Sequence, residues 1–418
     1  MTRSLSLIFA VAVMAGLCQV WLVEAPWHHI YSDIDGYMNR AFKLAFGEPL
    51  QPLDAFIPMG LPAFYAIFFW MFDDTGFQVI AVLQIMMMAA VHVLVGLTSH
   101  RLFGDRRMAL MAAILSLVYW PLTGQLSFYM AEPVCTFLVV AGQYCFVRFV
   151  DERGLLWVAG AGLLFGLAAT MKTQGWVFAI ATLLTLVFWP AARSKLVMWL
   201  PVFLLAAMLP LAVQSGQIRS ATGADAWFVL PGNGSYNMYN GQSARRGVGT
   251  WDNGNFHIYF TSNAYFDDGL LPPIVFNASI LDNTFFEEQL GALWRQDPVR
   301  QVLRMGVSAS ELFALQPQWP LRNVEVYSRL EVFFKYLALP VVYLPCFLLL
   351  WLSLKSRQLP PQLAYIALPV LGIMAVAALT SGQPRYLNPF LPNLMILAAA
   401  GWATLLRSQQ RTESRRQV

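Results

Sequence analysis

Two carboxylates two residues apart, Asp33 and Asp35, lie in the segment YSDIDGYMNR at residues 31–40. A pair with this spacing can hold a divalent cation through its oxygen atoms. Alternatively, one carboxylate can act as a general base while its neighbour positions a substrate hydroxyl group. A simpler interpretation is a solvated turn at the start of a helix, with Ser32 or Asp33 as the N-cap residue. The spacing alone leaves these interpretations open.

Three further ionisable residues stand at the ends of apolar runs far along the chain. Glu132 begins one run, Lys172 ends the run GLLFGLAATMK, and Arg385 precedes Tyr386 in GQPRYLNPFLP. Ionisable side chains at a membrane are costly, so each is a candidate for a functional site. Each also fits a structural role. Glu132 could be an acid stabilised by the dipole at a helix N-terminus. Lys172 could be a lysine that snorkels to the membrane interface, and Arg385 could be an interface anchor. If Lys172 and Arg385 met at one interface, they could instead clamp a phosphate.

The composition places these residues in an integral membrane protein. Only 12% of the 418 residues are charged, 58% are hydrophobic, and the mean hydropathy is +0.54, whereas a soluble domain carries about 25% charged residues. Apolar runs of about 20 residues predict membrane helices rather than the short alternating strands of a barrel. We therefore expect an all-α polytopic membrane protein with about ten transmembrane helices. The predicted runs are residues 5–23, 77–99, 108–123, 129–148, 154–171, 174–190, 195–214, 333–354, 362–380 and 387–406.

Basic residues gather in alternate turns between these runs, at residues 100–107, 148–153 and 193–195. Under the positive-inside rule these turns face the cytoplasm, so both termini are cytoplasmic and the loop holding Asp33 is outside. The same alternation places every ionisable candidate named above at the outer interface. The net charge of +4 therefore reflects orientation, and we expect no nucleic-acid partner.

The chain divides into three predicted parts. Residues 1–215 form an N-terminal transmembrane module, and its first outer loop, residues 24–76, has the prolines and amphipathic pattern of interfacial helices. Residues 216–330 are polar and too long for a bare loop, so we expect a small extracytoplasmic domain there. Residues 331–418 hold the last transmembrane helices and a cytoplasmic tail.

The sequence predicts no required cofactor. The four cysteines lie inside apolar runs, and neither they nor the five histidines have the spacing of a metal site. A divalent cation at Asp33 and Asp35 stays open. The chain has no P-loop, no Rossmann glycine-rich turn and no Ser-His-Asp pattern, which argues against nucleotide-dependent and serine-hydrolase chemistry.

Taken together and in order, six segments resemble the GT-C glycosyltransferases, and more closely the bacterial branch related to protein O-mannosyltransferases and aminoarabinose transferases. They are SDIDGYMNRAFKLAFGEP, IPMGLPAFYAIFFWMF, YMAEP, GLLFGLAATMKTQGWVF, GNGSYNMYNGQSA and GQPRYLNPFLPNLMILAAAG. The resemblance implies a helical membrane bundle with interfacial helices and an outer-facing cavity. It also implies a place in the bacterial inner membrane, with the active site on the periplasmic face.

The reaction implied by the resemblance is transfer of a sugar from a polyprenyl phosphate, with inversion, to a lipid, glycan or protein acceptor. By position, Asp33 would be the general base or would bind the acceptor. Asp35 would position the acceptor or help to hold a cation, and Glu132 would orient the sugar or the acceptor.

The resemblance assigns the other candidates to donor binding. Lys172 and Arg385, which is followed by Tyr386, would stabilise the phosphate as negative charge develops on it. The segment from Gly232 to Gly241 would line the sugar pocket or its lid, through Tyr236, Asn237 and Tyr239. The lipid tail of the donor would need only an apolar groove between helices. Membrane lipids would be further partners.

Two other functions would leave different patterns in the sequence. A lipid or sugar transporter would place charged or broken helices near the middle of the bilayer, whereas these runs are almost free of charge. A lipid-linked oligosaccharide polymerase or ligase also acts on outer lipid-linked sugars, but we would expect its chemistry on arginines and a histidine in late outer loops. The acidic pair directly after the first run favours the GT-C interpretation.

Overall fold

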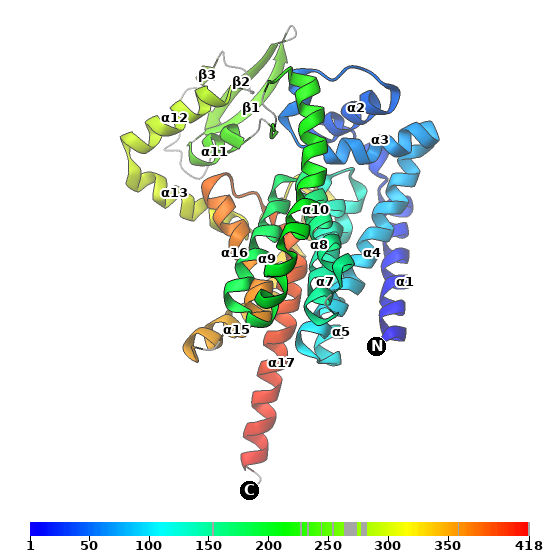
Figure 1. Cartoon of the computed structure of the whole chain (residues 1–418), viewed down its shortest axis with the longest axis vertical. Coiled ribbons are helices and arrows are strands. Elements are labelled where there is room, and N and C mark those ends of the chain that lie inside the picture. The colour runs from blue at the N-terminus through cyan, green and yellow to red at the C-terminus, as the bar shows by residue number, and fades with distance from the viewer. Residues whose placement is uncertain are drawn as a thin grey trace.

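The protein is described here from a computed structural model. The residues that it describes are 1–152, 154–225, 228–231, 234–243, 245–252, 255–262, 274–276, 282–357 and 359–416. Both chain termini lie at the lower end of a helical bundle, and the polar segments gather at the upper end (Figure 1).

Helices along the bundle occupy all of the predicted apolar runs. They are α1 (Thr2–Cys18), α4 (Gly76–Phe103), α5 (Arg106–Val118), α6 (Trp120–Gly124), α7 (Ala131–Glu152), α8 (Leu155–Met171), α9 (Trp176–Phe188), α10 (Pro190–Thr222), α14 (Glu325–Ala338), α15 (Leu344–Lys355), α16 (Pro361–Leu379) and α17 (Leu391–Arg416). The predicted all-α membrane class is therefore confirmed.

The number of crossings is smaller than the predicted ten when each helix is judged by length and composition. Within the described part of the chain, seven helical segments are long and apolar enough to span a membrane, or eight if the bent pair Arg106–Val118 and Trp120–Ser127 is one span. Two shorter apolar helices, Leu155–Met171 and Thr173–Thr185, correspond to the remaining predicted runs. They fall short because a perpendicular crossing needs about 20 residues.

Helix α8 packs against both α7 and α10. Gly162 and Gly166, four residues apart on α8, allow this packing. A Cβ atom at Gly162 would lie 2.3 Å from the Phe203 carbonyl oxygen, and one at Gly166 would lie 2.2 Å from that of Ala207. Small residues at this spacing let two membrane helices approach backbone to backbone. The closeness fixes α8 against α10.

The first outer loop folds into two helices, α2 (Asp33–Phe46) and α3 (Gly60–Phe72). Both lie at the upper end of the bundle, where α3 runs across the direction of α4 (Figure 1). Arg40 and Lys43 of α2 reach the 3-10 helix Pro52–Phe56: Lys43 Nζ lies 2.9 Å from Asp54 Oδ2, and Arg40 Nε donates to the Asp54 carbonyl oxygen at 2.9 Å. These contacts hold the loop as one unit.

The predicted small outer domain contains both helices and strands. Its helices are α11 (Gly234–Gln242), α12 (Asn283–Gln296) and α13 (Pro298–Glu311). Its strands β1 (Arg245–Asp252), β2 (Asn255–Ser262) and β3 (Ile274–Phe276) form an antiparallel sheet in that order, with Arg245 opposite Ser262 and Ile258 opposite Phe276. The sequence did not predict this sheet.

The outer domain contacts the bundle through α11 and α13, and α13 packs against α16. At the end of α11, a Cβ atom on Gly241 would lie 1.2 Å from the Thr380 carbonyl oxygen, so only glycine fits. Gln242 Nε2 donates to the Leu379 carbonyl oxygen at 2.9 Å. These contacts fix α11 above the end of α16.

Candidate active site

The first candidate residues that the fold brings together are Asp33 and Arg385. Asp33 opens α2, and Arg385 lies in the 3-10 helix Pro384–Phe390, which leads into α17. Both Nη atoms of Arg385 lie 3.2 Å from Asp33 Oδ2, and Nε donates to Gln383 Oε1 at 2.8 Å. In the part of the chain that the structure describes, Asp33 Oδ1 has no hydrogen-bond partner. One carboxylate oxygen is thus held while the other is available.

A second acid–base pair joins Glu132 and Lys172. Glu132 lies in the first turn of α7, and Lys172 directly follows α8. Lys172 Nζ lies 2.6 Å from Glu132 Oε1. The Glu132 side chain is only 2% exposed, and among the described residues its Oε2 atom has no hydrogen-bond partner. A buried acceptor without a partner costs free energy unless a ligand supplies a donor, so Oε2 is a candidate ligand contact.

The ring of Tyr386 connects the two pairs. Lys172 Nζ lies 4.7 Å from the ring centroid, and the Arg385 Cζ atom lies 5.6 Å from it. Cations within about 6 Å of an aromatic centroid are attracted by its negative face. The prediction that distant charged residues converge at one end of the bundle therefore describes the structure for Asp33, Glu132, Lys172 and Arg385.

A cavity of about 210 Å³ opens beside this cluster. Its wall contains the polar side chains of Thr173, Gln174 and Asn237, together with Tyr386. The remaining wall is supplied by Trp176, Val177, Ile180, Val376, Thr380 and Ser381. Since Thr173 and Gln174 follow Lys172 directly, the cavity adjoins the second acid–base pair.

The predicted residues of α11 differ in their surroundings. Asn237 lines the cavity, whereas Tyr236 and Tyr239 are buried in a small core with Phe286. The Tyr236 ring also packs 5.6 Å from that of Phe56 in the first outer loop. Burial raises the pKa of Tyr236 to about 12, and Tyr386 and Asp33 add to the rise. Gly232, the predicted start of this segment, lies outside the described residues.

Asp35 is the one predicted acid that stands apart. Its side chain is exposed, and within the described residues no ion pair or side-chain hydrogen bond involves it. Asp33 and Asp35 would be two oxygen ligands for a cation, but Asp33 is paired with Arg385. No group of three His, Cys, Asp or Glu side chains that could hold a metal occurs among the described residues. Asp33 and Asp35 therefore do not fit a resident cation as a pair.

Two residues at the site were missed from the sequence. Tyr37 lies one turn after Asp33 on α2, and burial raises the pKa of its hydroxyl group, with Asp33 and Glu132 adding to the rise. A phenol in this setting stays neutral and can donate a hydrogen bond. Trp319, from the loop between α13 and α14, lies beneath Arg385 with its ring centroid 4.6 Å from Cζ. The spacing of Asp33 and Tyr37 on one helix face could have identified Tyr37.

Residues 57–216 match the dolichyl-phosphate-mannose-protein mannosyltransferase family. No curated protein matches the chain. Among solved structures, the archaeal oligosaccharyltransferase AglB from Archaeoglobus fulgidus, in complex with an inhibitory peptide and a dolichol-phosphate, is similar with a TM-score of 0.53 and 15% identity. That alignment covers 98% of this chain and 51% of the other.

The same archaeal enzyme tethered to an acceptor peptide is similar with a TM-score of 0.53 and 14% identity, covering 97% of this chain and 50% of the other. The structure of this archaeal enzyme in complex with Zn and sulfate is similar with a TM-score of 0.53 and 14% identity. That alignment covers 96% of this chain and 49% of the other. This chain thus spans about half the length of these solved structures, and at such identities the likeness concerns the fold. Residues 57–216 are thus similar in sequence to the mannosyltransferase family, and nearly the whole chain shares the fold of the membrane part of these solved glycosyltransferases.

Proposed function

We propose that the protein transfers a sugar from a polyprenyl-phosphate donor to a hydroxyl or amino group of a lipid, glycan or protein acceptor. The observation that carries the proposal is the pairing of two acids with two bases, Asp33 with Arg385 and Glu132 with Lys172, around one tyrosine ring and beside a cavity. Dolichol-phosphate in the complex of the structurally similar archaeal enzyme supports a lipid-phosphate donor.

In the proposed reaction, the acceptor oxygen or nitrogen attacks the anomeric carbon as the bond from that carbon to the phosphate oxygen breaks. Polyprenyl phosphate leaves with the bonding electrons, and attack from the opposite side inverts the anomeric centre. Asp33 Oδ1 takes the acceptor proton as general base, because Arg385 holds only the other oxygen. Asp35 positions the acceptor from the exposed side.

Negative charge that develops on the leaving phosphate is stabilised by Arg385 and Lys172. Arg385 offers a planar fork and Lys172 a compact ammonium with three donors, of which Glu132 uses one. Preformed donors of this kind need no reorganisation as the reaction proceeds. Glu132 Oε2 and Asn237 orient the sugar, and Tyr236 and Tyr239 hold α11 in place as part of the lid.

The proposed site faces the extracytoplasmic side, and both termini face the cytoplasm. Alternate basic turns support this orientation. The test is a Glu48→Cys variant in the exposed loop after α2, labelled in intact cells with a maleimide that does not cross membranes. Rapid labelling relative to the unsubstituted chain is expected, and labelling only after the membrane is opened would reverse the assignment.

The activity is tested by incubating the reconstituted protein with a panel of polyprenyl-phosphate sugars and acceptors. Mass spectrometry should detect released polyprenyl phosphate together with a glycosylated acceptor, and nuclear magnetic resonance should show the inverted linkage. No release from any donor would defeat the proposal. Lipid-linked oligosaccharides in the panel test the polymerase or ligase alternative, which would extend them in preference to transferring one sugar.

A further inference from the structure

The Arg385 guanidinium group has an aromatic contact in addition to its polar contacts. Its nitrogen atoms face Asp33 Oδ2 and Gln383 Oε1, and its Cζ atom lies over the Trp319 ring, 4.6 Å from the ring centroid. The Arg385 side chain is 14% exposed. Stacking on an aromatic ring fixes the plane of a guanidinium group, which a single ion pair does not do.

The same tryptophan also contacts the segment that carries the proposed base. The ring of Tyr31, two residues before Asp33, packs edge-on against Trp319 at 6.0 Å. Farther along the same loop, Asn323 Nδ2 donates to the Tyr31 hydroxyl oxygen at 2.9 Å. Trp319 thus lies between the two segments that supply Asp33 and Arg385.

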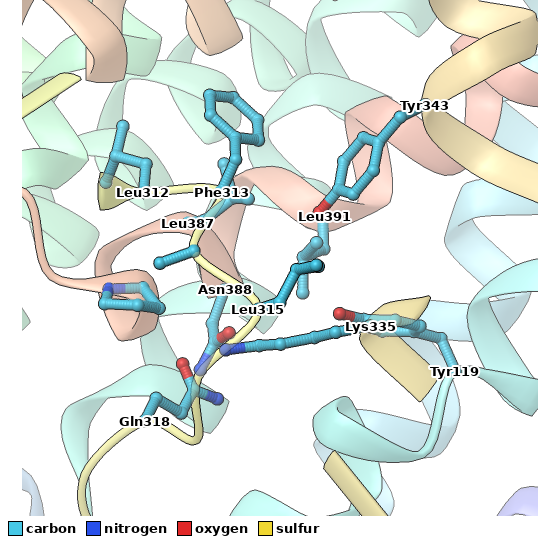
Figure 2. Close-up of a pocket in the computed structure, with 12 residues that line it drawn as sticks. Tyr119, Leu312, Phe313, Leu315, Gln318, Lys335, Tyr343, Leu387, Asn388 and Leu391 are labelled. Atoms are coloured by element: carbon cyan, nitrogen blue, oxygen red, sulfur yellow. The ribbon is translucent and has the colours of Figure 1, made fainter. Parts of the chain in front are cut away.

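A buried ion pair on α14 holds the loop that carries Trp319. Lys335 Nζ lies 2.8 Å from Glu331 Oε1, and the two side chains are 9% and 0% exposed. Lys335 donates to the Gln316 carbonyl oxygen at 2.7 Å, and the Gln318 backbone N–H donates to Glu331 Oε2 at 2.9 Å. Figure 2 shows Lys335 extending between Tyr119 and the side chains of Gln318 and Asn388. Both backbone anchors lie within three residues of Trp319.

We infer that Trp319 is a positioning residue for Arg385. Its ring holds the guanidinium in the plane in which the two Nη atoms face Asp33 and, during the reaction, the donor phosphate. The buried pair of α14 fixes the loop so that the ring stays in place. The inference rests on the proposed function, because the bound phosphate is part of that function.

The test compares Trp319→Leu with Trp319→Phe. Both variants keep an apolar side chain, but only phenylalanine keeps an aromatic face for the cation. Trp319→Leu should raise the KM for the polyprenyl-phosphate sugar roughly 3- to 30-fold, the range expected for a cation–aromatic contact. The KM for the acceptor should stay unchanged, and Trp319→Phe should stay within about threefold of the wild type. Trp351→Ala, at an exposed position on α15, is the control.

A merely structural role would lower the amount of active protein and therefore kcat, while both KM values stayed the same. The decisive measurement is made in an Arg385→Gln background. There Trp319→Leu should change the donor kcat/KM by less than about twofold, since coupled residues are non-additive. A full additional loss would overturn the inference.

The inference and the proposed function fail in different ways. If the wild-type protein releases polyprenyl phosphate from none of the donors, both are overturned. If the wild type is active and Trp319→Leu matches Trp319→Phe in donor KM, only the positioning role of Trp319 is overturned.

Discussion

Arg385 and Asp33 are 352 residues apart in the chain, and both Nη atoms of the arginine lie 3.2 Å from one carboxylate oxygen of the aspartate. The pair joins the start of α2 to the segment before α17. The proposed base is therefore fixed through one carboxylate oxygen, and its other oxygen is left for the acceptor.

Replacing Asp33 with Asn should lower kcat by about 100-fold or more, because a general base typically contributes 10²–10⁴-fold. The amide keeps the shape of the side chain and cannot take the proton. Product formation is measured by mass spectrometry, with Asp74→Asn, an exposed residue of the turn before α4, as the matched control. Near-normal turnover by Asp33→Asn would exclude Asp33 as the base.

Replacing Arg385 with Gln should cost about 2.7–4 kcal/mol of transition-state stabilisation, the usual cost of removing one donor from a charge-stabilising site. Arg385→Lys should recover only part of the loss, since lysine lacks the planar fork. The measurement is kcat/KM for the donor. An unchanged dependence on donor concentration would show that Arg385 only anchors the helix end.

Removing one partner of the Glu132–Lys172 pair should destabilise the protein strongly. Lys172→Met leaves a carboxylate that is 2% exposed without its cation, and loss of one partner of a buried pair typically costs about 3–5 kcal/mol. The double variant Glu132→Gln with Lys172→Met should recover much of the stability and none of the activity. Thermal unfolding in detergent and sugar transfer are measured in parallel; equal unfolding temperatures for the single and double variants would contradict this account.

Gly241→Ala should loosen the outer domain from the bundle, because its Cβ atom would overlap the Thr380 carbonyl oxygen. Gly234→Ala, at the start of α11, is the matched control, since a Cβ atom there meets no other atom within 4 Å. The expected result is faster limited proteolysis of residues 216–330 in Gly241→Ala alone. The same rate in both variants would mean that this close approach does not hold α11.

His29 should make the folded protein less stable in mild acid. Burial lowers the pKa of His29, while Glu24 partly offsets the shift. Below the ordinary pKa of about 6.5, the unfolded chain binds a proton before the folded chain does, so stability falls as the pH falls. His29→Gln should show a smaller drop in unfolding temperature between pH 7.5 and pH 5.5 than the wild type or than His28→Gln, which alters the exposed neighbour. An equal drop would remove His29 as the cause.

Hydropathy and turn charges were enough to predict the bundle. The apolar runs correspond to helices, and the alternation of basic turns correctly predicted that the outer loop and the outer segment lie at one end (Figure 1). The sheet of β1, β2 and β3 was not predicted, because β1 and the sequence from Gly232 that precedes it are rich in glycine and turn-forming residues. Two of the helices are shorter than a full crossing, which an apolar run read from sequence does not reveal.

The charged residues of the site were predictable because an ionisable side chain at a membrane costs free energy, so such a residue usually has a function. Their pairing was not. The sequence suggested two cations free to clamp a phosphate, whereas each is matched with an acid, Arg385 with Asp33 and Lys172 with Glu132. Trp319 was missed because stacking on Arg385 depends on a loop path that no periodicity encodes.

The glycine contact between α8 and α10 also bears on the position of Lys172. Lys172 follows the last residue of α8, and the carbonyl groups of α10 lie too close to Gly162 and Gly166 for the helices to slide past each other. The Lys172 ammonium group is therefore attached to the end of a helix that is fixed against its neighbour. The position of Lys172 beside Glu132 is therefore set by the packing of α8 against α10.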